Sequence, residues 1–110
     1  MIKITFYTQG KYFVGVLSKG HANYDDYGKD IVCSAVSTIT QSLALGILEV
    51  LKIKADYKVD NNAGYLELRL PNLADEVLDK TEILFDTAYR SVSDLAKGYP
   101  SNIKVEVKDL

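Results

Sequence analysis

The 110-residue chain has a single cysteine, a single histidine and no tryptophan. One cysteine excludes an intramolecular disulfide. One histidine and one cysteine supply only two of the usual ligands of a zinc ion, so we expect no metal site. Because no nucleotide-binding motif is present either, we expect the protein to act without a cofactor.

Positive charge is also scarce, since 13 Lys and Arg residues face 15 Asp and Glu residues and the formal net charge is -2. Nucleic-acid binding relies on a basic surface that neutralises phosphates. Although a local basic patch is compatible with this total, we expect no direct contact with nucleic acid.

Long apolar runs are missing as well. The longest apolar stretch, Ile31–Leu51, is interrupted by six polar residues: Ser34, Ser37, Thr38, Thr40, Gln41 and Ser42. We therefore expect no membrane span. The chain opens on the strand-like "MIKITFY" rather than on an apolar signal region, which predicts a soluble, reduced, cytoplasmic protein.

Hydrophobic residues make up 47% of the chain, enough for a core in one domain over residues 1–110. Alternating apolar and polar residues predict hairpins over 2–17 and 55–71 and a last strand over 103–110.

Apolar residues at intervals of three or four predict two long helices, over 31–51 and 73–97. Gly98 and Pro100 end the second helix. The resulting order β-β-α-β-β-α-β indicates an α+β fold, with a mixed, mostly antiparallel sheet and both helices packed on one face.

The segment "GHANYDDYGKDIVCSAVS", Gly20–Ser37, contains both His21 and Cys33. The residues before Asp30 show no periodicity and predict a mobile loop. Asp30 is suited to cap the first helix, which places Cys33 in the first turn. There, free amides and the helix dipole would lower the pKa of the thiol, and the amides of Cys33 and Ser34 would bind an oxyanion.

His21 ends the predicted second strand and could pair with the Cys33 thiolate as general base and acid. Asp30 is our first candidate for orienting the imidazole, ahead of Asp25 and Asp26, although capping alone explains Asp30 equally well. A plainer interpretation also stays open. A lone cysteine in an apolar helix is more often a small buried hydrophobe, and a lone histidine near a turn is more often a surface residue.

Two stretches, Gly20–Ala22 and Gly28–Ala35, resemble the signature of the Prp family of ribosomal-processing cysteine proteases. The resemblance implies that Cys33 is the nucleophile and His21 its base and acid. It also implies that the substrate is the N-terminal segment of a ribosomal protein precursor, large-subunit ribosomal protein twenty-seven, and that the protein is a homodimer.

The family's cleavage sequence ends in paired aromatic residues, which implies an apolar groove. Tyr24 and Tyr27 in the loop, and Ser37 one helical turn beyond Cys33, are candidate substrate contacts. The tyrosines could equally face solvent, and Ser37 could be only a small helix residue. We expect the loop over 22–29 to close over a bound peptide.

Two alternatives belong to other functional classes. One is a non-catalytic ribosome-associated binding module, in which the loop is a recognition surface. The other is a redox sensor with Cys33 as its thiol. The missing second cysteine disfavours a sensor that forms an intramolecular disulfide, and the negative charge suits a basic ribosomal protein as partner, but neither observation decides.

Overall fold

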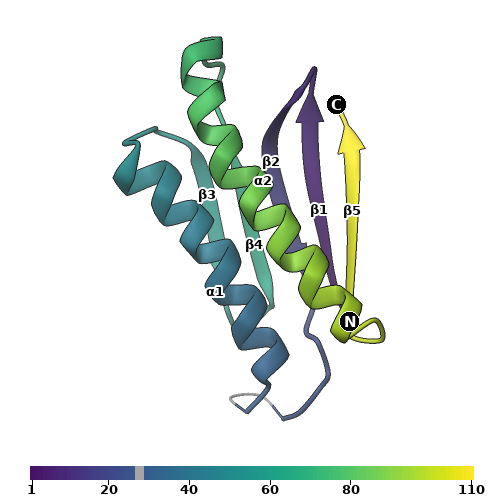
Figure 1. Cartoon of the computed structure of the whole chain (residues 1–110). Coiled ribbons are helices and arrows are strands. Elements are labelled where there is room, and N and C mark those ends of the chain that lie inside the picture. Colours follow the sequence, from purple (N-terminus) through teal and green to yellow (C-terminus); the bar gives the residue numbers. More distant parts are fainter. Residues whose placement is uncertain (27–28) are drawn as a thin grey trace.

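The computed structural model describes residues 1–26 and 29–110. The predicted order of elements is confirmed: β1 (Ile2–Gln9), β2 (Tyr12–Lys19), α1 (Ile31–Leu45), a π-helical segment η1 (Gly46–Val50), β3 (Asp56–Asp60), β4 (Tyr65–Arg69), α2 (Asp75–Gly98) and β5 (Ile103–Asp109). Both long helices lie on the same face of one sheet, as the sequence predicts (Figure 1).

The sheet is mixed and mostly antiparallel, in the order β3-β4-β2-β1-β5. The β1–β2, β2–β4 and β3–β4 pairs are antiparallel, while β5 runs parallel to β1 with Ile2 opposite Ile103. A parallel neighbour requires a long crossover, and α2 supplies it. Lys19 at the end of β2 lies opposite Tyr65 at the start of β4, so His21 follows beside the β3–β4 turn.

The core fills the space between the sheet and the helices. Its most deeply buried large side chains come from both layers: Ile4, Phe6, Val16 and Leu68 from strands, and Ile47, Phe85 and Val92 from helices. Val107 lies opposite the buried Phe6 in the β1–β5 pair and so is on the core face of the sheet, yet its side chain is 46% exposed. It is exposed because α2 crosses the sheet obliquely and leaves the end of β5 uncovered (Figure 1).

The first helix changes geometry before its predicted end at Leu51. It is α-helical to Leu45 and then widens into η1, which closes with the Leu51 N–H donating to the Gly46 carbonyl at 2.9 Å. At Gly46 an added Cβ would lie 2.8 Å from Cδ1 of Leu84 on α2. The missing side chain thus lets the two helices approach closely.

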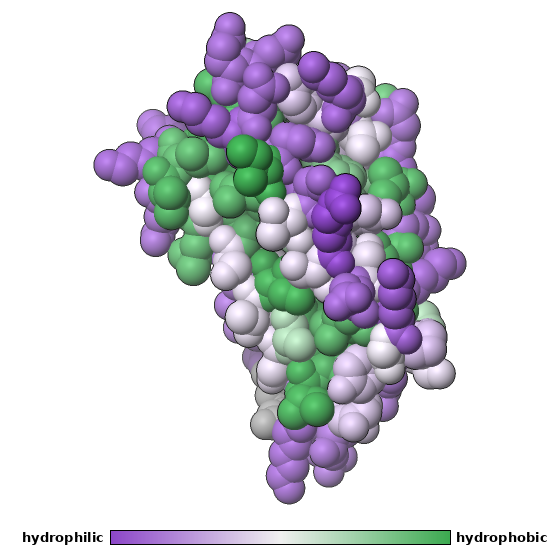
Figure 2. Space-filling model, in the orientation of Figure 1, coloured by the Kyte–Doolittle hydropathy of each residue, from purple (hydrophilic) through white to green (hydrophobic). Residues whose placement is uncertain are grey.

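The continuous helical stretch Ile31–Val50 is long and apolar enough to cross a membrane, with a mean hydropathy of 1.8 in its 18-residue window. On length and composition alone, the expectation of no such segment was wrong. In the structure, however, Val32, Val36 and Ile47 of this stretch are buried in the core, and a core helix passes the same test. Figure 2 shows hydrophobic residues between hydrophilic ones on the helix side of the molecule.

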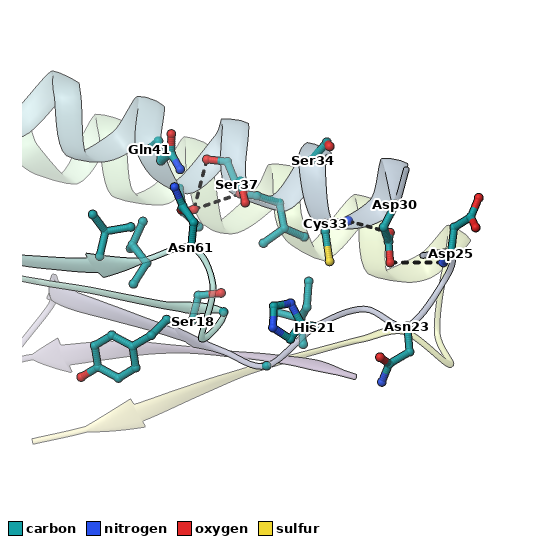
Figure 3. A pocket seen from close by; sticks show the side chains of 18 residues that line it. Ser18, His21, Asn23, Asp25, Asp30, Cys33, Ser34, Ser37, Gln41 and Asn61 are labelled. Atoms are coloured by element: carbon teal, nitrogen blue, oxygen red, sulfur yellow. Dashed lines mark hydrogen bonds between the residues drawn. The ribbon is translucent and has the colours of Figure 1, made fainter. Parts of the chain in front are cut away.

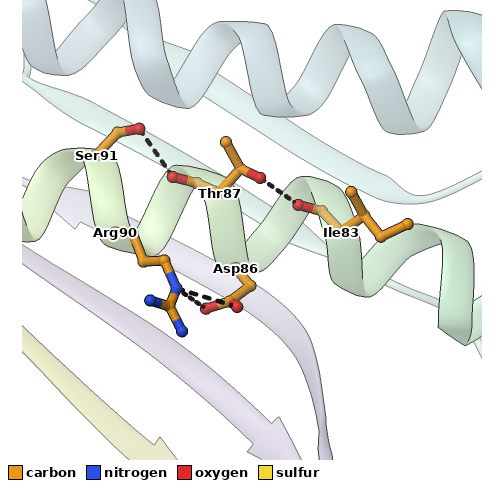
Figure 4. A network of polar contacts seen from close by, with 5 residues as sticks. All are labelled: Ile83, Asp86, Thr87, Arg90 and Ser91. Atoms are coloured by element: carbon orange, nitrogen blue, oxygen red, sulfur yellow. Dashed lines mark hydrogen bonds and ion pairs between the residues drawn. The ribbon is translucent and has the colours of Figure 1, made fainter.

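The outer surface of α2 carries short-range polar contacts (Figure 4). The hydroxyls of Thr87 and Ser91 donate to the carbonyls one turn earlier, of Ile83 and Thr87, at 2.6 and 2.8 Å. Arg90 pairs with Asp86 at 3.2 Å, and both side chains are solvent-exposed. Such an exposed pair stabilises the helix by only ~0.3–0.5 kcal/mol. We interpret this face of α2 as a solvated helix surface.

Candidate active site

A cavity of about 560 Å³ lies between α1 and the sheet, at the end where β2 stops (Figure 3). His21 and Cys33 both line it. The other lining residues come from β1, β2, the loop, α1 and the β3–β4 hairpin: Ile2, Ser18, Gly20, Asn23, Asp25, Asp30, Ser34, Val36, Ser37, Thr40, Gln41, Val59, Asn61, Gly64, Tyr65 and Leu66. The structure therefore brings the chain's one thiol and one imidazole to the same cavity.

Asp30 is the N-cap of α1, as predicted. Its Oδ1 accepts hydrogen bonds from the amides of Val32 and Cys33, both at 3.0 Å, and its Oδ2 accepts from Tyr24 at 2.9 Å and Asp25 at 3.3 Å. Burial raises the pKa of this 6%-exposed carboxyl, but the four amides outweigh burial and hold its pKa below the usual value. The carboxylate thus joins the helix start to the preceding loop.

The four hydrogen bonds described for the Asp30 carboxylate come from backbone amides, and its second role, orienting the imidazole, stays a prediction. Asp25 accepts from the amide of Asp26 at 2.7 Å. The backbone carbonyl oxygen of Asn62 lies 3.2 Å from His21 Nε2. A carbonyl only accepts, so this contact favours the neutral tautomer with the proton on Nε2 and the basic lone pair on Nδ1.

The β3–β4 turn fits closely against the end of β2. The amide of Gly20 donates to the Gly64 carbonyl at 2.8 Å. Gly64 has φ +62°, and an added Cβ would lie 2.5 Å from the Gly20 oxygen and 3.0 Å from Cε1 of His21. A glycine is needed at this position both for its backbone conformation and for the space occupied by the ring.

Cys33 is half-buried in the first turn of α1, and its Sγ accepts a hydrogen bond from the Ala22 amide at 3.2 Å. Burial raises the pKa of the thiol, the Asp30 carboxylate raises it further, and the Ala22 amide opposes both. The expected lowering of the thiol pKa is therefore wrong for this structure. The carboxylate that caps the helix also places a negative charge beside the sulfur.

The two amides predicted to bind an oxyanion are already engaged by Asp30. The Cys33 amide donates to its carboxylate at 3.0 Å, and the Ser34 amide donates to its carbonyl at 3.1 Å. The cap that satisfies the helix terminus thus takes the donors that the helix start would otherwise offer.

The predicted substrate contacts separate into three groups. Ser37 lines the cavity. Tyr24 is not among the lining residues; its ring lies 5.5 Å from that of Tyr99, at the end of α2, and is 49% exposed. Tyr27 lies outside the described residues, and so its predicted role stays a prediction.

Sequence reasoning missed the wall formed by β3 and its turn, which includes Val59 and Asn61. The hairpin pattern identifies the turn but not the element that it faces. Within residues 1–26 and 29–110, the structure contains no group of three or more His, Cys, Asp or Glu residues placed to hold a metal ion.

An α+β domain that places a thiol and an imidazole in one cavity has the make-up of a cysteine hydrolase. The family model described as cysteine protease Prp matches residues 1–104. The chain belongs to this family and is a cysteine protease.

Individual relatives agree with this assignment. The ribosomal processing cysteine protease Prp of Staphylococcus aureus is 27% identical over 107 residues, with 97% of each chain covered. A crystal structure of a Streptococcus mutans protein superposes with a TM-score of 0.85 at 26% identity, covering 100% of this chain and 96% of the other. The Staphylococcus aureus protease in complex with a covalently linked product peptide gives a TM-score of 0.86 at 25% identity, covering 98% of this chain and all of that one.

Proposed function

We propose that this enzyme removes the N-terminal extension of large-subunit ribosomal protein twenty-seven, with Cys33 as nucleophile and His21 as general base and acid. The observation that carries the proposal is that both residues line one cavity, with the Cys33 sulfur hydrogen-bonded to the residue that follows His21. The names of the relatives support a ribosomal substrate, and the covalently linked peptide in the Staphylococcus aureus enzyme supports covalent chemistry.

Acyl transfer proceeds in two stages. The thiol proton moves to His21, on Nδ1 in the tautomer that Asn62 selects, and Sγ attacks the peptide carbonyl carbon. The carbonyl π electrons move to oxygen and return as the C–N bond breaks, while the imidazolium gives its proton to the departing amine. Water, deprotonated by His21, then attacks the thioester, and the sulfur leaves with the proton restored.

The cavity is chemically suited to an extended peptide with apolar side chains. Ile2, Val36, Val59 and Leu66 give it an apolar surface, and Val59 is 47% exposed although it lies on the helix side of β3. Ser37 and Gln41 on α1 add polar groups on the opposite wall. We assign the apolar part to the side chains that precede the scissile bond and the polar groups to the peptide backbone.

The proposal extends to the context of the protein. We propose that residues 1–110 form one protease domain that works in the cytoplasm as a homodimer, without a cofactor. Sedimentation at micromolar concentration tests the homodimer, with a 12.2 kDa monomer as the contrary result.

The test mixes the protein with a synthetic peptide that spans the extended N-terminus of the ribosomal protein. Cleavage should be lost in Cys33→Ala and His21→Ala and retained in Ser42→Ala, a matched control on the exposed side of α1. Binding without cleavage by the wild type would support the binding module instead, and oxidation of Cys33 without cleavage would support the redox sensor.

A further inference from the structure

We propose that Asn102, outside the family signature, is a positioning residue that holds Ala22 so that its N–H points at the reacting sulfur. This inference rests on the proposed function, because it assigns an oxyanion donor to the same site. A donor from outside the helix start is needed because Asp30 already engages the amides of Cys33 and Ser34.

Asn102 reaches the site from the other end of the chain. Its side-chain Nδ2 donates to the carbonyl of Ala22 at 2.8 Å, across 80 residues. Its own backbone is fixed on both sides, since its amide donates to the Tyr99 carbonyl at 3.0 Å and its carbonyl accepts from the Ile2 amide at 2.8 Å. The donor thus belongs to a rigid connection between α2 and β5.

The two backbone groups of Ala22 connect Asn102 to the sulfur of Cys33. Its carbonyl accepts from Asn102, and its amide donates to Cys33 Sγ at 3.2 Å. The residue is 1% exposed, so water cannot readily replace the side-chain amide as the carbonyl's partner. A fixed carbonyl restricts the backbone rotation that would turn the N–H away from the sulfur.

The Ala22 N–H acts at two stages of the proposed reaction. Before attack, a hydrogen bond to Sγ favours the thiolate over the thiol. After attack, the oxyanion is two bonds from Sγ, so a donor already within hydrogen-bond distance of the sulfur needs only a small shift to reach the oxygen. Donors that are fixed before charge develops on that oxygen stabilise the transition state most.

The test compares Asn102→Ala with the wild type on the extended peptide, and Asn72→Ala in the exposed β4–α2 connection serves as the matched control. We expect kcat to fall about 10- to 100-fold with little change in KM, because the donor is displaced rather than the peptide. The pH midpoint of Cys33 alkylation by iodoacetamide should move upward, which a merely structural contact would not cause. Asn72→Ala should match the wild type in both measurements.

Two more variants distinguish loss of the Asn102 hydrogen bond from misfolding. Asn102→Asp keeps the shape but presents an acceptor to the Ala22 carbonyl, whereas Asn102→Gln keeps the NH2 group, so glutamine should restore kcat and the alkylation midpoint more than aspartate. Equal values for these two variants, or wild-type values in a folded Asn102→Ala, would overturn the inference. Failure of the wild type to cleave the peptide would contradict the proposed function instead. The alkylation midpoints would still show whether Asn102 acts on the sulfur.

Discussion

Nε2 of His21 lies 3.2 Å from the backbone carbonyl oxygen of Asn62, a residue 41 positions later in the β3–β4 turn. As an acceptor, the carbonyl favours the tautomer with the proton on Nε2 and directs that nitrogen toward the turn. The orientation of the candidate base therefore depends on a hairpin whose outer strand, β3, is an edge strand of the sheet.

Gly64→Ala tests this dependence. An added Cβ would collide with the Gly20 oxygen at 2.5 Å and press on the His21 ring at 3.0 Å. We expect peptide cleavage to fall by more than about tenfold, because misplacing the proposed base raises the barrier to proton transfer. Gly10→Ala is the matched control, since Gly10 has φ +61° with nothing within 4 Å of an added Cβ. Both variants should lose about 1–2 kcal/mol of stability from the left-handed backbone, and Gly64→Ala should lose more because of its clash with Gly20. Equal activity in the two variants would contradict this account of the ring.

Asp30→Ala should destabilise the protein by about 0.5–2 kcal/mol, the usual cost of removing an N-cap. The free energy of unfolding in urea measures this effect. Asp30→Asn, which keeps an acceptor oxygen, should cost less than alanine. A loss in Asp30→Ala no larger than that of an exposed-site variant such as Asp94→Ala would show that the cap contributes little.

The lowered pKa of the Asp30 carboxyl should make the stability of the protein depend on pH. Because its folded pKa lies below the usual value, its contribution to stability is present above the unfolded pKa and is lost as the pH falls through the folded pKa. Wild type should therefore lose more stability than Asp30→Asn on acidification below the ordinary carboxyl pKa, about 3.9. Parallel stability–pH curves for the two proteins would contradict the assignment.

Cys33 should titrate above the ordinary thiol pKa in the absence of substrate peptide. Burial and the neighbouring Asp30 carboxylate raise its pKa, so the iodoacetamide reaction should have a midpoint above the ordinary thiol value of about 8.5. Asp30→Asn should lower that midpoint by removing the negative charge. A midpoint well below the ordinary value would show that the helix dipole and His21 dominate, as the sequence alone led us to expect.

Val59 provides a test of the apolar wall. If substrate side chains cover it, Val59→Ala removes two methyl groups from the contact, at up to ~0.8 kcal/mol each, and KM should rise by up to about tenfold. Val107→Ala is the control, because Val107 is exposed to the same degree, 46% against 47%, and is not among the residues that line the cavity. The same KM in both variants would place the peptide elsewhere.

The structural features that depend on neighbouring residues in the chain could be predicted from the sequence. The start of α1 at Ile31 follows from the Asp30 carboxylate and the helical period that begins there, and both are local signals. The alternation of apolar residues likewise identified β3 and β4.

The contacts that complete the site were not predictable, because they join segments far apart in the chain. Nothing local in "NNAG" indicates that the Asn62 carbonyl faces His21, and nothing near Asn102 indicates that its side chain reaches Ala22. The thiol pKa was predicted in the wrong direction for a related reason. The sequence suggests a helix dipole, but whether burial and a carboxylate outweigh it depends on the folded surroundings.

The central claim is that Cys33 Sγ becomes covalently bonded to the carbonyl carbon of the substrate. Mass spectrometry of the protein quenched in acid during peptide cleavage tests it directly. We expect the mass of the protein to rise by that of the N-terminal fragment less one water, with the adduct on Cys33 and removable by hydroxylamine as a thioester. Continued cleavage by Cys33→Ala at the wild-type rate, with no adduct on either protein, would contradict the account.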